Sequence, residues 1–108
     1  MDIAKGWEEQ TLSTGTRYYY HNERREFQVD PPYYEILGLD PLQCDKYGKS
    51  EIRAAWFKKK TLDSGLVREA YERLRHTNSR VEYNHRNIQS HNKLVNSTGL
   101  YALSVMLN

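Results

Sequence analysis

The pattern of hydrophobic and polar positions changes character at Pro31-Pro32. Before this pair, short runs of aromatic and β-branched residues alternate with small polar clusters, as in short strands joined by turns. After it, apolar residues recur at the three- and four-residue spacing of helices. Proline has no backbone N–H and pushes the preceding residue into extended geometry. The pair therefore marks a boundary between two parts of the chain.

The first part predicts three short strands, over Trp7–Leu12, Arg17–His21 and Glu26–Val29. Polar turn clusters at 13–16 and 22–25 separate them. Strands this close in sequence form an antiparallel meander. A sheet of this size is marginal on its own.

The second part predicts helices. A short helical turn over Tyr33–Leu37 ends at Gly38, and a loop over Asp40–Lys49 follows. The next helix is expected from Glu51 to about Leu62, and a further one begins near Leu66. Two such helices joined by a short turn form an αα-hairpin.

The ends of these helices are predicted from local signals. Ser50 is the expected N-cap of the longer helix, and Ser64-Gly65 is the expected turn after it. Beyond Asn84 the chain is rich in Asn, His and Ser, which favours loop or frayed helix.

The predicted fold class is α+β, with a small three-stranded antiparallel sheet packed against a shortened helical hairpin. Because no linker separates Pro32 from Tyr33, we expect the two parts to share a core.

Composition narrows the function classes. The 108 residues are 38% hydrophobic and 12% aromatic, with mean hydropathy −0.90. The longest apolar stretch, Leu100–Leu107, is far shorter than the ~20 residues that span a bilayer, so no membrane segment is expected. The N-terminus lacks the apolar core of a secretory signal, so we expect an intracellular protein of the cytoplasm or nucleus. The net charge is only +2, with an excess of acidic groups in residues 1–32 and of basic groups in residues 33–108.

Residues 5–32 resemble a WW domain. The resemblance is carried by Gly6-Trp7-Glu8-Glu9, Thr14-Gly15, Arg17-Tyr18-Tyr19-Tyr20 and Pro32. It implies that Trp7, Tyr19 and Pro32 pack on one face of the sheet as structural residues. It also implies that the other face binds proline-rich peptide in the polyproline II conformation.

The implied peptide-binding residues depart from the WW pattern. They are Tyr18, Tyr20, Phe27 and Val29. Val29 stands where the family has its second Trp and offers no aromatic wall for proline rings. Phe27 replaces the usual Thr or Ser, and His21 the usual Asn. We therefore expect a degenerate peptide slot, used for packing or for an atypical ligand. The alternative is that Tyr18 and Phe27 simply cover a neighbouring domain.

Residues 33–84 resemble a J domain, the co-chaperone module. Four motifs in family order carry the resemblance: Tyr33-Tyr34-Glu35-Ile36-Leu37-Gly38-Leu39, Glu51-Ile52-Arg53-Ala54-Ala55-Trp56, Glu69-Ala70-Tyr71-Glu72-Arg73-Leu74 and Arg80-Val81-Glu82-Tyr83-Asn84. Trp56 and Tyr71 fall within these motifs and are expected to be structural. The His-Pro-Asp loop that triggers ATP hydrolysis in the chaperone partner is absent from the chain. The resemblance thus implies a degenerate J domain without stimulating activity.

The helix expected from Glu51 carries four basic side chains, Arg53, Lys58, Lys59 and Lys60. In J domains a basic second helix contacts the chaperone. Two other interpretations stay open: a solvated charged face with lysines that compensate the helix dipole, or nonspecific contact with nucleic-acid phosphates.

No catalytic constellation is evident. Cys44 is expected to fill space, and the spacing of His76, His85 and His91 does not place them on one helical face as a metal pair requires. We expect neither enzyme activity nor cofactor nor metal. Asn96-Ser97-Thr98 fits a glycosylation acceptor, but without a secretory signal it is incidental. The predicted function is a non-enzymatic adaptor that binds proline-rich or acidic protein partners through a WW-like and an inactive J-like module. The alternative is a small nucleic-acid-associated protein that uses the basic second helix.

Overall fold

The computed structural model describes residues 3–62 and 65–88. The chain divides into two compact units. The first, here called the sheet unit, comprises the described residues of 1–32 and those from His85 onward. The second, the helical unit, comprises Tyr33–Asn84. The fold is α+β, as the sequence predicts.

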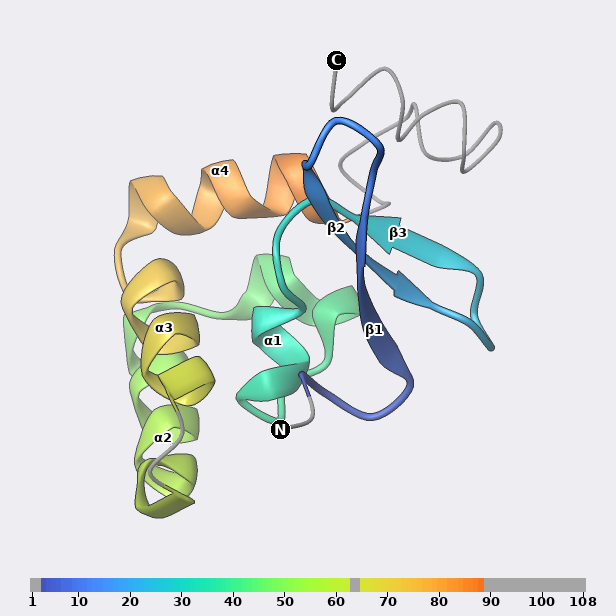
Figure 1. The fold of residues 1–108 in the computed structure, drawn as a ribbon. Helices are drawn as coiled ribbons and strands as arrows, with labels where there is room; N and C mark the ends of the chain where they lie inside the picture. The colour runs from blue at the N-terminus through green and yellow to red at the C-terminus, as the bar shows by residue number, and fades with distance from the viewer. Residues whose placement is uncertain (1–2, 63–64, 89–108) are drawn as a thin grey trace. The chain divides into compact units, whose positions relative to one another are not determined.

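The sheet unit is built on three antiparallel strands in the order β1-β2-β3, which confirms the predicted meander (Figure 1). The strands are β1 (Trp7–Thr11), β2 (Arg17–His21) and β3 (Glu26–Gln28). β2 has the predicted bounds, whereas β1 and β3 each end one residue early. The register is fixed by pairs such as Trp7 opposite His21 and Tyr20 opposite Phe27.

One face of the sheet carries its buried side chains. Trp7 is only 7% exposed, and its ring meets the His21 imidazole edge-on at 5.4 Å between centroids. His21 is held from a second side, because its Nδ1 accepts a hydrogen bond from the Arg24 N–H at 3.2 Å. Tyr19 is buried beside them and donates its hydroxyl to Glu9 at 3.2 Å. Trp7 and Tyr19 thus lie on one face, since residues directly opposite in antiparallel strands share a face.

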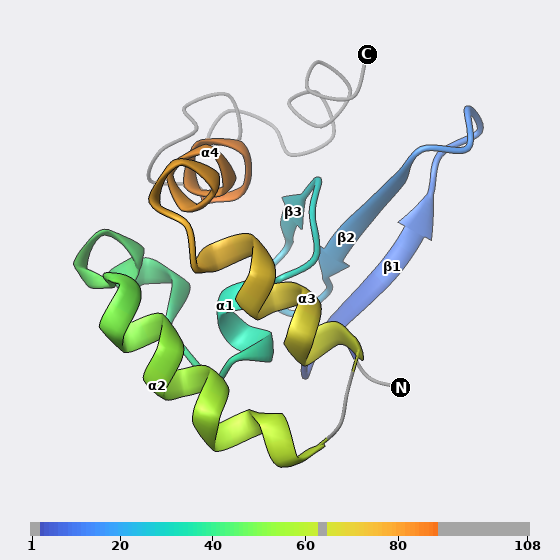
Figure 2. The same ribbon diagram turned by 90° about the vertical axis from the view of Figure 1, so that its left-hand side faces the viewer.

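The helical unit contains the predicted hairpin of α2 and α3, with α1 packed against α3 (Figure 2). Its elements are α1 (Tyr33–Ile36), the 3-10 helix η1 (Pro41–Lys46), α2 (Lys49–Lys59), the 3-10 turn η2 (Lys60–Leu62), α3 (Gly65–Leu74) and most of α4 (Thr77–Asn87). The predicted turn at Ser64-Gly65 falls partly outside the described residues, and Gly65 itself begins α3.

Two local predictions for this unit are wrong. The expected loop over Asp40–Lys49 contains η1, because the Asp40 carboxylate accepts a hydrogen bond from the Leu42 N–H at 3.0 Å and caps a turn. The N-cap of α2 is Gly48 rather than Ser50. The Glu51 carboxylate accepts a hydrogen bond from the Gly48 N–H at 2.7 Å. This bond caps the N-terminus of α2, so the helix begins at Lys49.

The prediction of loop or frayed helix beyond Asn84 is wrong for residues 85–87, which belong to α4, and its part beyond residue 88 lies outside the described residues. Asparagine has low helix propensity, but both of these asparagines have partners within their own unit. Asn84 accepts the Tyr34 hydroxyl at 2.6 Å. Asn87 accepts the Asp30 N–H at 2.8 Å and donates to the Asp30 carboxylate at 2.8 Å. These tertiary hydrogen bonds outweigh the local preference.

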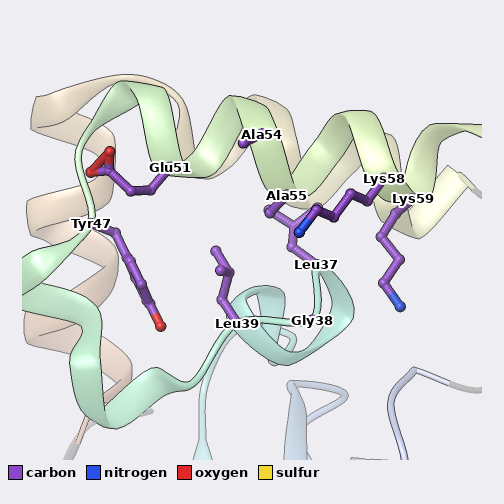
Figure 3. Close-up of a pocket in the computed structure, with 9 residues that line it drawn as sticks. All are labelled: Leu37, Gly38, Leu39, Tyr47, Glu51, Ala54, Ala55, Lys58 and Lys59. Atoms are coloured by element: carbon purple, nitrogen blue, oxygen red, sulfur yellow. The ribbon is translucent and has the colours of Figure 1, made fainter.

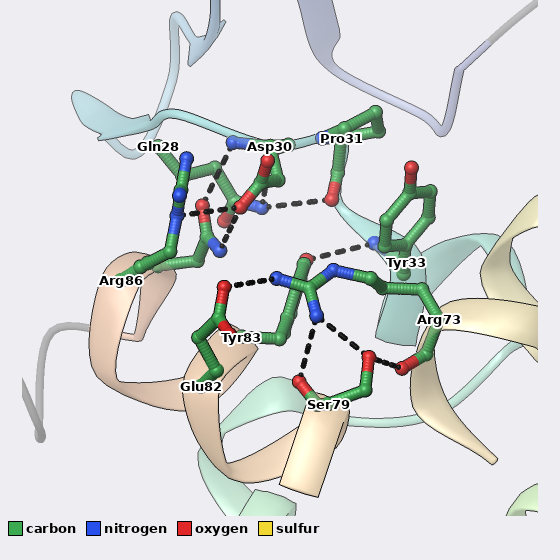
Figure 4. A network of polar contacts seen from close by, with 10 residues as sticks. Gln28, Asp30, Pro31, Tyr33, Arg73, Ser79, Glu82, Tyr83 and Arg86 are labelled. Atoms are coloured by element: carbon green, nitrogen blue, oxygen red, sulfur yellow. Dashed lines mark hydrogen bonds and ion pairs between the residues drawn. The ribbon is translucent and has the colours of Figure 1, made fainter. Parts of the chain in front are cut away.

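Tyrosines form much of the core of the helical unit. Tyr34 and Tyr83 are almost fully buried, and their ring centroids lie 5.7 Å apart. The Tyr83 hydroxyl accepts the Tyr33 backbone N–H at 3.0 Å, and the Tyr33 hydroxyl donates to Glu69. A separate polar cluster joins α3 to α4, because the Arg73 guanidinium donates to Ser79 (Figure 4). The core therefore combines apolar contact with satisfied hydroxyl groups.

Candidate protein-binding surfaces

Three aromatic side chains gather on the face of the sheet opposite Trp7. They are Tyr18, Tyr20 and Phe27, and all are half-buried. The Phe27 ring lies near both tyrosines, with its centroid 4.7 Å from that of Tyr20 and 6.2 Å from that of Tyr18. We call this set the aromatic platform. The alternation of β2 brings the tyrosines together, and the register of β3 places Phe27 beside them.

The rings of the platform pack on one another instead of enclosing a slot. A proline ring held between two aromatic rings needs about 7 Å between them, since carbon atoms in contact lie about 3.5–4.0 Å apart. The Tyr18 and Phe27 centroids are closer than this, and their planes are tilted by 42°. A ligand would therefore lie across the platform and not between its rings.

The platform has an acidic border on β1. Glu8 stands opposite Tyr20 and Gln10 opposite Tyr18, so both share the platform's face. Gln10 donates a hydrogen bond to the Glu8 carboxylate at 3.2 Å. Glu8 is exposed and forms no ion pair among the described residues. The border thus offers an unneutralised carboxylate to a ligand.

Val29 is half-buried and follows the last residue of β3. The chain turns immediately after the strand, because the Gln28 side-chain amide donates to the carbonyls of Asp30 and Pro31 at 3.0 and 3.1 Å. Arg86 at the end of α4 forms an ion pair with Asp30 at 3.1 Å (Figure 4). Asp30 and Arg86 could not be singled out from the sequence, since partners 56 positions apart leave no local signal.

The residues expected to be structural differ in their surroundings. Trp7, Tyr19 and Pro32 are buried. Trp56 and Tyr71 are only half-buried, and their rings stack at 4.4 Å with planes 12° apart. This pair joins α2 to α3 near the surface of the hairpin.

The four basic side chains predicted to act together in one helix do not form a single surface. Arg53 and Lys60 flank the exposed ring of Phe57, at 5.6 and 4.1 Å from its centroid. Lys58 and Lys59 instead line a groove along another side of α2. Because 3.6 residues make one helical turn, each residue is rotated by about 100° from the one before it, and the two pairs therefore point to different sides.

The groove has a volume of about 370 Å³ and lies wholly within the helical unit (Figure 3). Leu37, Gly38 and Leu39 form one side, at the end of α1. The other side is formed by Tyr47 and by one face of α2, namely Glu51, Ala54, Ala55, Lys58 and Lys59. This groove is not among the sites predicted from the sequence.

The remaining candidate chemistry is inert or outside the described residues. Burial, assisted by the Asp45 carboxylate, raises the pKa of the Cys44 thiol to about 11, so it stays protonated near neutral pH. Burial also raises the pKa of the Tyr34 hydroxyl. His76 and His85 are exposed, while His91, the Asn96-Ser97-Thr98 sequence and Leu100–Leu107 lie outside the described residues.

Within residues 3–62 and 65–88, no three His, Cys, Asp or Glu side chains gather in a way that could hold a metal ion. None of the helices in this described part has the length and apolar character to cross a bilayer. No protein-family model, curated protein or solved structure matches the chain. The WW and J resemblances therefore stay predictions.

Proposed function

We propose that the chain is a non-enzymatic adaptor that binds a protein partner through the aromatic platform of its sheet unit. The observation that carries the proposal is the contiguous set of three half-buried rings on the face opposite Trp7. Aromatic rings on a small sheet supply apolar area at low cost in side-chain entropy, which suits them to peptide recognition. The resemblance to a WW domain over the same residues points to the same face.

The ligand that fits this platform is an extended, proline-containing peptide. The polyproline II conformation is pre-formed, so its binding costs little chain entropy. The packed rings and the aliphatic Val29 offer contact from one side only, so binding is weak. Glu8 at the border favours a lysine or arginine beside the prolines.

The test is an NMR titration of the full chain with a proline-rich peptide that contains arginine. Shift changes should centre on Tyr18 and Phe27 and should be lost in Tyr18→Ala and Phe27→Ala. Phe57→Ala is the matched control, since it removes an exposed ring outside the platform. Val29→Trp should tighten binding by adding an aromatic wall. No shift change in either the wild type or Val29→Trp would refute the proposal.

The nucleic-acid alternative is separated from this function by a second titration, with single-stranded DNA. Phosphate-driven binding weakens steeply with salt, whereas contact of prolines with rings does not. Glu8 on the border of the platform repels phosphate, which favours the peptide ligand. Because the chain lacks a His-Pro-Asp sequence, the helical unit should not stimulate ATP hydrolysis by a heat-shock chaperone.

A further inference from the structure

The groove along α2 combines an apolar floor with a charge at each end. Leu37, Leu39 and Ala55 supply the floor, as Figure 3 shows between α1 and α2. Glu51 lies at one end of the groove, and Lys58 and Lys59 at the other. The helical rise of 1.5 Å per residue gives a length of about 10 Å between these ends.

The two ends of the groove differ in how their charges are used. The Glu51 carboxylate accepts the Gly48 N–H at 2.7 Å, at the positive end of the α2 dipole. Lys58 and Lys59 form no ion pair among the described residues. Their charges also lie in the last turn of α2. The groove thus presents two unneutralised ammonium groups beside apolar surface.

The position of Lys59 explains how a lysine lines this groove. Its stem passes over Gly38, with Cε only 3.1 Å from the place where a Cβ on Gly38 would lie. A long basic side chain can cover apolar surface with its methylenes while its charged end stays in water. The ammonium group therefore stays available at the rim while the stem helps to shape the wall.

We propose that this groove docks an acidic segment of a partner protein, with its apolar side chains over the floor and its carboxylates at Lys58 and Lys59. The charges of the groove require an anionic partner, and the apolar floor requires a side chain that gains from burial. A length of about two helical turns suits a short amphipathic helix. This site is built from other residues than the aromatic platform, so it is independent of the function proposed above.

The probe is a dye-labelled peptide of about twelve residues with two leucines one helical turn apart and two glutamates in the next turn. Two control peptides replace either the glutamates by lysine or the leucines by asparagine. Binding to the full chain is followed by fluorescence anisotropy at low and high salt. The acidic leucine peptide should bind and weaken with salt, and both control peptides should bind at least about tenfold more weakly.

Two charge-reversed variants with the same change in net charge separate the groove from the rest of α2. Lys58→Glu/Lys59→Glu should weaken peptide binding about tenfold or more, and Arg53→Glu/Lys60→Glu less than about twofold. Ala54→Gln adds bulk at an exposed groove position and should also weaken binding without a change in charge. The single variant Lys58→Glu keeps the contact of the Lys59 stem with Gly38, so it tests the charge without a change in this packing. Circular dichroism checks that every variant is folded.

Four results would overturn the proposal. The first is equal weakening by the two charge-reversed variants, which would indicate attraction to the whole helix. The second is equal binding of the asparagine control peptide, which would exclude a role for the apolar floor. The third is no binding by the folded wild type at about 1 mM peptide, the level of very weak affinity. The fourth is self-association of the wild type in sedimentation without peptide that is lost in Lys58→Glu, which would show that a second copy of the chain occupies the groove.

Discussion

Replacing Gly6 by alanine tests how tightly the buried face of the sheet is packed. Gly6 has a φ of +87°, and a Cβ there would lie 2.2 Å from Nε2 of His21. The left-handed backbone costs alanine about 1–2 kcal/mol. Moving the imidazole gives up its hydrogen bond from Arg24 and its edge contact with Trp7, each worth about 1 kcal/mol. We therefore expect Gly6→Ala to lower the free energy of unfolding by about 3–4 kcal/mol.

Urea unfolding in a Trp56→Phe background measures this loss, because Trp7 is then the sole tryptophan that reports on the transition. Gly15→Ala is the matched control: Gly15 has a φ of +92° but nothing within 4 Å of an added Cβ, so only the backbone cost of about 1–2 kcal/mol applies. In a His21→Ala background the cost of Gly6→Ala should fall to the same value. Equal costs for Gly6→Ala in both backgrounds would refute the close packing of Gly6 against His21.

Three further predictions concern single residues. Arg25 has a φ of +53° in the exposed turn before β3, so Arg25→Gly should raise the free energy of unfolding by about 1 kcal/mol in the same urea experiment. The Cys44 thiol should react with iodoacetamide in native protein at pH 8 far more slowly than in urea, since its raised pKa and its burial both disfavour attack. Because the pKa of the Cys44 thiol is higher in the folded than in the unfolded chain, the thiol contributes to the free energy of unfolding below the unfolded pKa of about 8.5. This contribution is lost as the pH rises toward about 11. Asn87→Ala removes both hydrogen bonds to Asp30 and should cost about 2–3 kcal/mol, whereas Asn78→Ala at an exposed position of α4 should cost less than about 0.5.

The sheet could be predicted from the sequence because its signals are local. A run of three tyrosines in 17–21 with polar turns on both sides predicts β2. Because successive side chains of a strand point to opposite faces, Tyr18 and Tyr20 are separated from Tyr19, which places the aromatic platform opposite the buried face. What the alternation does not give is the distance between rings. The closeness of Phe27 to both tyrosines depends on the register of β3.

The end of α4 could not be predicted, because its asparagines gain their stability from distant partners. Asn84 bonds to Tyr34 and Asn87 to Asp30, and neither pairing leaves a trace in local composition. The groove was missed for a different reason. The composition of this helix groups the four basic residues together, but the 100° rotation per residue in a helix places Lys58 on the side of Ala54 and Ala55 and leaves Arg53 on another.

The two proposed binding surfaces can be tested separately, because each is built from residues of one compact unit. The aromatic platform and its acidic border belong to the sheet unit, and the groove with its two free ammonium groups belongs to the helical unit. Their charges are opposite, so they select different ligands: a basic, proline-containing segment for the platform and an acidic, leucine-containing segment for the groove. Phe27→Ala should therefore leave the acidic peptide bound, and Lys58→Glu/Lys59→Glu should leave the proline-rich peptide bound.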